Sequence, residues 1–187
     1  VFAWRPAPVQ ATWLGYFGTT GVAEIDWILV DRPSVSPSLE ACFTERALFL
    51  PDTRLCFTPP SAAPPVERRS GPFTFGCFQA LDKINDGVLD VWARIFSAMP
   101  AARLRVQSRQ LADPVVRDAF AARLRARAIP ASLHGPTTRE RYLAAHGVVD
   151  VLLDTFPYTG GTTTCEALWM GVPTLTLEGE SLLSRQG

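Results

Sequence analysis

The alternation of hydrophobic and polar positions predicts a series of strands and helices over the second half of the chain. Short apolar segments predict strands at residues 73–78, 104–107, 131–134, 148–153 and 172–177. Apolar residues at helical spacing, or capping residues, predict helices at 86–98, after Asp113-Pro114, from Thr137 to about 147, and at 162–170. Strands that alternate with helices in this way are typical of an α/β fold with a parallel sheet and helices on both faces.

The first third of the chain is less regular. We expect strands at residues 9–14, 25–30 and 55–57, and a helix that is capped by Ser36 and runs to about residue 49. Five prolines then lie between residues 58 and 72, where they disfavour both helix and central strand. The sequence therefore predicts two domains, residues 1–64 and residues 65–187. The chain begins without Met and stops just after a predicted strand, so we expect a fragment of a longer protein.

Composition narrows the classes of function. Lys+Arg and Asp+Glu are balanced at 18 each, so no global positive charge favours a nucleic-acid partner. The longest apolar segments are far too short to cross a bilayer, and we expect no membrane partner. Four scattered cysteines and two histidines lack the spacing of a metal site, and unpaired thiols fit a reducing compartment. We therefore expect a cytoplasmic protein without a metal or other cofactor.

The segment from residue 148 to residue 177 is the strongest candidate for a ligand site. It predicts a strand, a loop with Gly160 and Gly161, a helix that starts at Thr162, and a second strand. The glycines would let a ligand approach the backbone, and the amides and hydroxyls of Thr162 and Thr163 would bind a diphosphate at the helix N-terminus. Glu166 lies one turn further on, within reach of a ribose hydroxyl. An ordinary β–α–β unit with a glycine turn remains the alternative.

Other polar residues are predicted to lie near the same edge of the sheet. Lys83 follows the strand at 73–78, where it would neutralise a departing phosphate unless it is simply solvated. Arg139, at the start of its helix, would also either neutralise a phosphate or be simply solvated. In the first domain, Gly15, Gly18 and Gly21 recur at every third position, which is a weak signal of a phosphate loop and is equally compatible with a turn.

Three segments of the sequence resemble a known family. Residues 5–21, 154–173 and 179–185 are similar, in order and spacing, to the catalytic region of the protein O-GlcNAc transferases and their SPINDLY-type relatives. The resemblance implies a GT-B-type core in which two Rossmann-like lobes hold a nucleotide sugar. It also implies transfer of GlcNAc from UDP-GlcNAc to Ser or Thr hydroxyls of acceptor proteins, with inversion and without a metal. Tetratricopeptide repeats usually precede this core in the family.

The resemblance also assigns roles to individual residues. Lys83 matches the lysine that stabilises the leaving diphosphate, and Thr162 and Thr163 match the threonines that bind the phosphates. Glu166 matches an acidic position that binds the ribose, and Arg139 lies where the family has a basic residue near the uracil. The remaining match, Gly15, is to a glycine whose loop borders the sugar.

The sequence departs from the animal enzymes at several of these positions. Gly161 replaces a histidine, Phe17 replaces a proline, Tyr142 replaces a histidine, and Gln79-Ala80 replaces an Asn-Gln pair. These changes leave the donor open between UDP-GlcNAc and the GDP-fucose of SPINDLY-type members. An enzyme related to UDP-GlcNAc 2-epimerases and a non-catalytic interaction module remain alternatives. We expect the fragment to be inactive alone.

Overall fold

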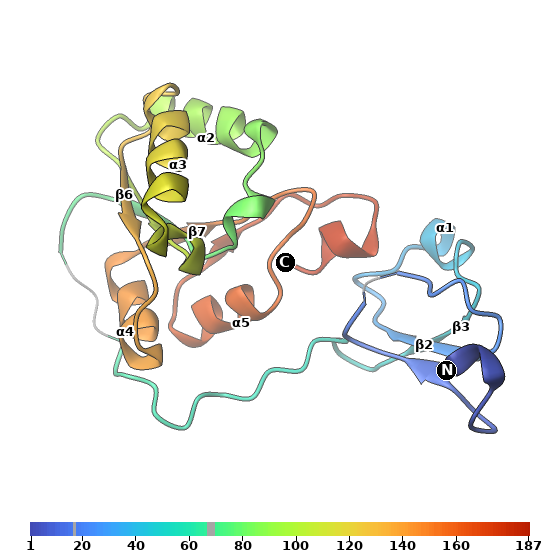
Figure 1. Cartoon of the computed structure of the whole chain (residues 1–187). Coiled ribbons are helices and arrows are strands. Elements are labelled where there is room, and N and C mark those ends of the chain that lie inside the picture. The colour runs from blue at the N-terminus through green and yellow to red at the C-terminus, as the bar shows by residue number, and fades with distance from the viewer. Residues whose placement is uncertain (17, 67–69) are drawn as a thin grey trace. The chain divides into compact units, whose positions relative to one another are not determined.

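The structure is a computed structural model that describes residues 1–16, 18–66 and 70–187 (Figure 1). Phe17, one of the departures from the animal enzymes, lies outside the described residues. The chain forms two compact units, one of residues 1–58 with 178–186 and one of residues 59–177 with Gly187. The units divide inside the proline-rich stretch, six residues before the predicted boundary. The segment 178–186 belongs to the first unit, although the sequence placed it in the second domain.

The second unit contains a five-stranded parallel sheet with the strand order β6-β5-β4-β7-β8. Its strands are β4 (Thr74–Cys77), β5 (Arg103–Gln107), β6 (Ala131–His134), β7 (Val151–Leu153) and β8 (Thr174–Leu175). Its α-helices are α2 (Asp86–Ala98), α3 (Pro114–Arg125), α4 (Arg139–Ala144) and α5 (Thr162–Trp169). Figure 1 shows α2 and α3 on one face of the sheet and α4 and α5 on the other. All five predicted strands and four predicted helices of this half are confirmed.

Two hydrophobic clusters hold these layers together. On one face, Trp92 and Phe96 of α2 and Phe120 of α3 pack against Phe75 and Val106 of the sheet. The other face has a smaller cluster, formed mainly by Phe78, Val149, Leu152, Ala167 and Val172. Each face buries one apolar side of its helices, which is the main source of stability in such a layered fold.

Capping residues explain where the helices begin. Asn85 accepts a hydrogen bond from the amide of Val88 at the start of α2, and Asp113 caps α3 in the same way. The start of α4 differs from the prediction by one residue, because Thr138 rather than Thr137 accepts from the amide of Arg141. Gly171 follows α5 with a φ of 70°, as expected for a glycine that ends a helix.

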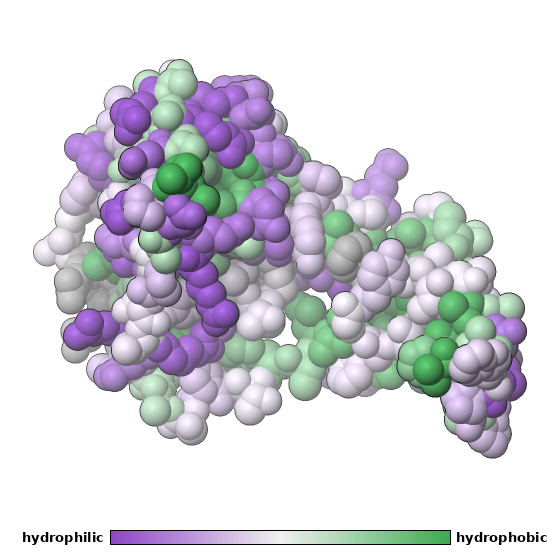
Figure 2. All heavy atoms as spheres, in the orientation of Figure 1, coloured by the Kyte–Doolittle hydropathy of each residue, from purple (hydrophilic) through white to green (hydrophobic). Residues whose placement is uncertain are grey.

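The visible face of the second unit is mostly hydrophilic, around a small hydrophobic patch over α3 (Figure 2). The exposed large hydrophobic residues of this helix are Val115 and Val116. No helix in the described ranges is long and apolar enough to cross a membrane.

The first unit contains a three-stranded parallel sheet with the order β1-β2-β3. The strands are β1 (Ala11–Thr12), β2 (Trp27–Val30) and β3 (Arg46–Phe49), and α1 (Pro37–Glu40) is a single turn capped by Ser36. The remaining short helices of the chain are 3-10 turns, η1 (Phe2–Trp4), η2 (Leu81–Lys83), η3 (Arg109–Ala112), η4 (Ala145–Val148) and η5 (Leu182–Arg185).

Two predictions for the first unit were wrong. The helix that begins at Pro37 ends at Glu40 instead of residue 49, and residues 46–49 pair with β2. In β3, Ala47 and Phe49 turn towards the core, so burial in a sheet overrides the helical pattern. The strand expected at 55–57 does not form, because the amides of Arg54 and Leu55 bond to the side chains of Asp31 and Thr53.

Candidate functional site

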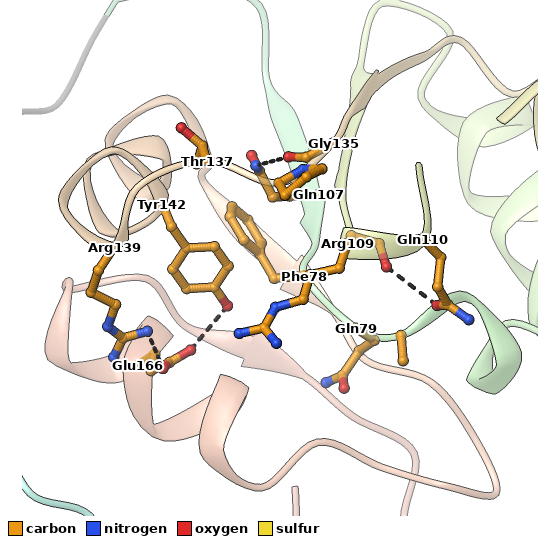
Figure 3. Close-up of a pocket in the computed structure, with 13 residues that line it drawn as sticks. Phe78, Gln79, Gln107, Arg109, Gln110, Gly135, Thr137, Arg139, Tyr142 and Glu166 are labelled. Carbon is orange, nitrogen blue, oxygen red and sulfur yellow. Dashed lines mark hydrogen bonds and ion pairs between the residues drawn. The ribbon is translucent and has the colours of Figure 1, made fainter. Parts of the chain in front are cut away.

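A cavity of ≈ 560 Å³ lies at the carboxyl ends of β4, β5 and β6. The segments that follow these strands form its wall together with side chains of α4 and α5 (Figure 3). The lining residues are Phe78, Gln79, Ala80, Gln107, Ser108, Arg109, Gln110, Gly135, Pro136, Thr137, Arg139, Tyr142 and Glu166. Open parallel sheets bind ligands at this edge, so the cavity has the position that the sequence predicted for a ligand site.

Arg139, Tyr142 and Glu166 form one hydrogen-bonded group in the wall of this cavity (Figure 3). Nη1 of Arg139 lies 2.5 Å from Oε1 of Glu166, and the hydroxyl of Tyr142 donates to Oε2 at 2.9 Å. The side chain of Glu166 is 7% exposed, whereas that of Arg139 is 54% exposed. Burial, reinforced by the adjacent carboxylate, raises the pKa of Tyr142, so its phenol remains a donor. Glu166 is therefore a fixed carboxylate whose remaining lone pairs can accept from a ligand hydroxyl.

Gln79 connects the cavity to the start of α5. Its Nε2 donates to Oγ1 of Thr163 at 2.7 Å and to Oδ1 of Asp154 at 3.1 Å. Its Oε1 accepts from Nζ of Lys83 at 3.4 Å. Gln79 is buried, so these contacts fix both Lys83 and the first turn of α5 relative to the end of β4.

Lys83 lies at the end of η2, against the loop that precedes α5. Its Nζ donates to the carbonyl of Thr159 at 3.3 Å and lies 3.7 Å from the ring centroid of Tyr158. Burial lowers the pKa of Lys83, and the nearby carboxylate of Asp154 opposes that effect. The structure thus brings Lys83 together with the predicted diphosphate site, as part of the same network.

The predicted site residues at the start of α5 differ in exposure and in their contacts. Thr162 is exposed, and Thr163 is half-buried beneath Gln79. Gly161 is the N-cap and supplies no side chain to the free amides of the first turn, which leaves them available to an anion. These amides and the Lys83 ammonium are the cationic and donor groups of the candidate diphosphate site.

Gly160 has a different role from the one expected. It is buried, and its amide donates to Oδ1 of Asp154 at 2.8 Å, so it does not face a ligand. A Cβ at this position would lie 2.7 Å from Oγ1 of Thr163 and 2.9 Å from Oγ1 of Thr164, and it would overlap Nε2 of Gln79. Gly160 is therefore required for close packing of the loop against Gln79.

Asp154 is a central residue of the site that the sequence reasoning did not identify. Its carboxylate accepts from the amides of Thr155 and Gly160, each at 2.8 Å, and from the hydroxyl of Thr176 at 2.9 Å. It is 5% exposed, and burial raises its pKa even though these donors and Lys83 act in the opposite direction. The available signal was an acidic residue directly after the buried strand β7.

Gly15, the last predicted site residue, belongs to the first unit, whereas the cavity belongs to the second. It is exposed, in a loop that is anchored further along by Glu45. The Thr19 hydroxyl and the Thr20 amide each donate to the Glu45 carboxylate at 2.7 Å. Burial would raise the pKa of Glu45, but the hydrogen bonds from Thr20 and Thr19 outweigh that effect and hold it at about 2.

In neither unit do the described residues include a group of three or more His, Cys, Asp and Glu side chains that could hold a metal.

A parallel sheet with helices on both faces and a candidate ligand site at its carboxyl edge is typical of α/β proteins that bind nucleotides. Comparison with known proteins identifies the family. The sequence model of glycosyl transferase family 41 matches residues 1–57 and 70–187, and the chain belongs to this family. The predicted family resemblance is therefore confirmed.

The similar proteins include plant and bacterial members. The chain is 41% identical over 191 residues to a probable UDP-N-acetylglucosamine–peptide N-acetylglucosaminyltransferase SPINDLY of Petunia hybrida, with 96% of this chain and 20% of that protein aligned. The corresponding Arabidopsis thaliana protein is 40% identical over 189 residues, which are 95% of this chain and 20% of that protein. The chain thus spans about a fifth of the length of these curated relatives.

A solved structure is also similar over nearly the whole chain. A lysine-to-methionine mutant of Thermobaculum terrenum O-GlcNAc transferase superimposes with a TM-score of 0.94 and 41% sequence identity. The match covers 99% of this chain and 36% of that one. Together with the two parallel sheets, it confirms the predicted α/β fold class of the GT-B type.

Proposed function

We propose that the protein containing this chain transfers GlcNAc from UDP-GlcNAc to Ser and Thr hydroxyls of acceptor proteins. Membership of glycosyl transferase family 41 supports sugar transfer, and the names of the plant relatives support the donor and the peptide acceptor. The observation that carries the proposal is the network in which Gln79 joins Lys83 to the first turn of α5 beside a cavity large enough for a nucleoside.

This network suits the charge that develops when a nucleotide sugar reacts. The acceptor hydroxyl attacks the anomeric carbon from the face opposite the diphosphate, and the bond from that carbon to the β-phosphate oxygen breaks. The diphosphate leaves with the bonding electrons, and the hydroxyl proton passes to a base. Lys83 and the free amides of α5 then stabilise the added negative charge without a metal. Attack from the opposite face inverts the anomeric configuration.

The cavity is the proposed site of the nucleoside. The Glu166 carboxylate, oriented by Arg139 and Tyr142, would accept from a ribose hydroxyl. The segment Gly135–Thr137 would border the base, since it forms the wall after β6. This assignment places the diphosphate between the cavity and Lys83, where Gln79 lies.

We also propose that the protein works in a reducing compartment such as the cytoplasm. All four cysteines are free, and two of them, Cys42 and Cys56, are exposed. Exposed unpaired thiols persist where disulfides are kept reduced. Localisation of the tagged full-length protein tests this proposal, and export from the cell would overturn it.

Calorimetry of the full-length protein with UDP and with GDP tests the donor. Binding of UDP in preference to GDP is the expected result. Preference for GDP would support a GDP-fucose donor instead, which the changes at Gly161 and Tyr142 relative to the animal enzymes make the second candidate. Binding of neither nucleotide would overturn the transferase proposal in favour of an interaction module.

A transfer assay tests the reaction itself. The full-length protein, with UDP-GlcNAc labelled in the sugar and a Ser/Thr-rich peptide library, should transfer label in the presence of EDTA. NMR of the product should show the anomeric configuration opposite to that of the donor. Loss of transfer on chelation would contradict metal independence, and retention of configuration would contradict the direct displacement.

A further inference from the structure

Arg109 is a cation in the cavity that the proposed function has not used. It begins η3 directly after β5, and its side chain extends into the cavity towards Tyr142 and Glu166 (Figure 3). Across the described part of the chain, Arg109 makes no ion pair and no side-chain hydrogen bond. In contrast, Arg123 of α3 and Arg127, which follows that helix, are paired with Asp86 and Asp90.

The charges of the cavity wall leave Arg109 without compensation. Three lining residues are charged, namely Arg109, Arg139 and Glu166. Arg139 and Glu166 neutralise each other at 2.5 Å, so the wall carries one net positive charge, on Arg109. When a ligand enters and displaces water from an unpaired guanidinium, an anionic group on the ligand compensates the lost hydration best.

The backbone around Arg109 is held firmly even though its side chain is free. The amide of Ser108 donates to the carbonyl of His134 at 3.0 Å, and Leu111 is 1% exposed. Gln110 is held in place, because its Oε1 accepts from the amide of Leu81 at 2.5 Å. Within this segment, binding of a ligand orders mainly the Arg109 side chain, which limits the entropic cost.

We propose that Arg109 binds the diphosphate of the donor, as a second cationic group besides Lys83. The inference rests on the proposed function. A guanidinium offers a planar set of donors that can bind two phosphate oxygens at once, whereas Lys83 acts as a point charge. Lys83 reaches the site from η2 beside the α5 loop, and Arg109 reaches it from η3 at the end of β5. Gln79 lines the cavity and contacts Lys83. A diphosphate beside Gln79 would therefore lie within reach of both Lys83 and Arg109.

Binding measurements with a nucleotide series test this role. Arg109→Ala in the full-length protein should weaken UDP binding about tenfold or more, and leave uridine binding within about twofold. Arg109→Lys keeps the charge but loses the planar donors, so its UDP affinity should lie between that of the wild type and that of Arg109→Ala. Arg125→Ala is the matched control, since Arg125 is an exposed arginine on α3 outside the cavity. Unchanged thermal unfolding of each variant would show that the fold is intact.

Each outcome has a distinct meaning. Equal loss of UDP and uridine affinity would overturn the phosphate contact and place Arg109 against the base or ribose. Unchanged UDP affinity would show a solvated side chain and overturn the inference alone, because wild-type binding would still support the proposed function. If the wild-type protein prefers GDP, the same series with GDP and guanosine applies. If it binds neither diphosphate, the proposed function and this inference both fail.

Discussion

Nη1 of Arg139 and Oε1 of Glu166 lie 2.5 Å apart in the wall of the cavity, and they join α4 to α5. The ion pair is asymmetric, since the carboxylate is buried and the guanidinium is half exposed. Tyr142 donates to the second carboxylate oxygen and packs edge-on against Phe78 with ring centroids 5.4 Å apart. The carboxylate is therefore held in one orientation before any ligand binds, which lowers the entropic cost of binding.

Substitution of Glu166 should weaken recognition of the ribose. Glu166→Gln removes the ion pair with Arg139 and one strong acceptor, so we expect UDP affinity to fall about tenfold or more. The preference for UDP over its 2′-deoxy and 3′-deoxy analogues should shrink in parallel, measured by calorimetry. Glu140→Gln, an exposed change on α4, is the control. An undiminished preference for the ribose hydroxyls would contradict a ribose contact.

Tyr142→Phe separates orientation of the carboxylate from its charge. The ring keeps its packing against Phe78 and His146, so we expect the free energy of unfolding to fall by only about 1 kcal/mol. UDP affinity should fall several-fold, less than in Glu166→Gln, because Arg139 still holds one oxygen. An effect as large as that of Glu166→Gln would mean that Tyr142 contacts the nucleotide directly.

Gly160→Ala tests whether close packing of the loop organises the diphosphate site. The added methyl group would overlap Gln79 and Thr163, so we expect a loss of about 1–3 kcal/mol in the free energy of unfolding by urea. UDP affinity should fall as well, because Gln79 also positions Lys83. Gly71→Ala is the control, since a Cβ there meets nothing within 4 Å. A variant with wild-type stability and affinity would show that the loop adapts freely.

Much of the second unit could be predicted from the sequence, because short stretches of neighbouring residues define its strands and helices. Apolar segments flanked by capping residues such as Asn85 and Asp113 define strands and helices within a few positions. In the first unit, residues 46–49 had an ambiguous pattern, and only their pairing with β2 makes them a strand. Local patterns do not encode that pairing.

The candidate site likewise contains residues that could be predicted from the sequence and contacts that could not. Lys83, Thr162 and Thr163 could be predicted, because each follows a strand at the carboxyl edge of a parallel sheet. The contact of Gln79 with Asp154 could not, since it joins side chains 75 positions apart. Arg109 was also missed, because an arginine after a strand looks like any solvated residue until the cavity wall is known.

The acid stability of the first unit should depend on Glu45. Its pKa of about 2 lies below the ordinary value of 4.5, so the carboxylate stabilises the folded state above pH 4.5 and loses this effect as pH falls towards 2. Glu45→Gln should therefore cost roughly 1–3 kcal/mol near pH 7, with the difference from wild type shrinking below pH 4.5. Urea unfolding at a series of pH values measures this, and Glu180→Gln is an exposed control. A difference that stays constant with pH would contradict the ionised anchor.

Lys83→Ala should separate catalysis from binding of the donor. The ammonium matters most when the diphosphate gains charge on leaving, so we expect kcat to fall about 10²- to 10³-fold while UDP affinity changes only a few-fold. Lys83→Arg should restore part of the turnover, and Arg94→Ala on the exposed face of α2 should leave it unchanged. A loss of UDP affinity with kcat unchanged at saturating donor would instead indicate a role in binding alone.

The pH profile of turnover gives a second test of Lys83. Because burial lowers its pKa, the ammonium loses its proton at a lower pH than an exposed lysine would. Wild-type kcat/KM for the donor should therefore decline on the alkaline side, as Lys83 becomes neutral in the free enzyme. The decline in kcat should lie at higher pH, because the bound diphosphate raises the pKa of Lys83. Lys83→Arg keeps its charge throughout, so its residual activity should lack this decline. An identical alkaline decline in that variant would assign the titration to another group and leave Lys83 without the proposed electrostatic role.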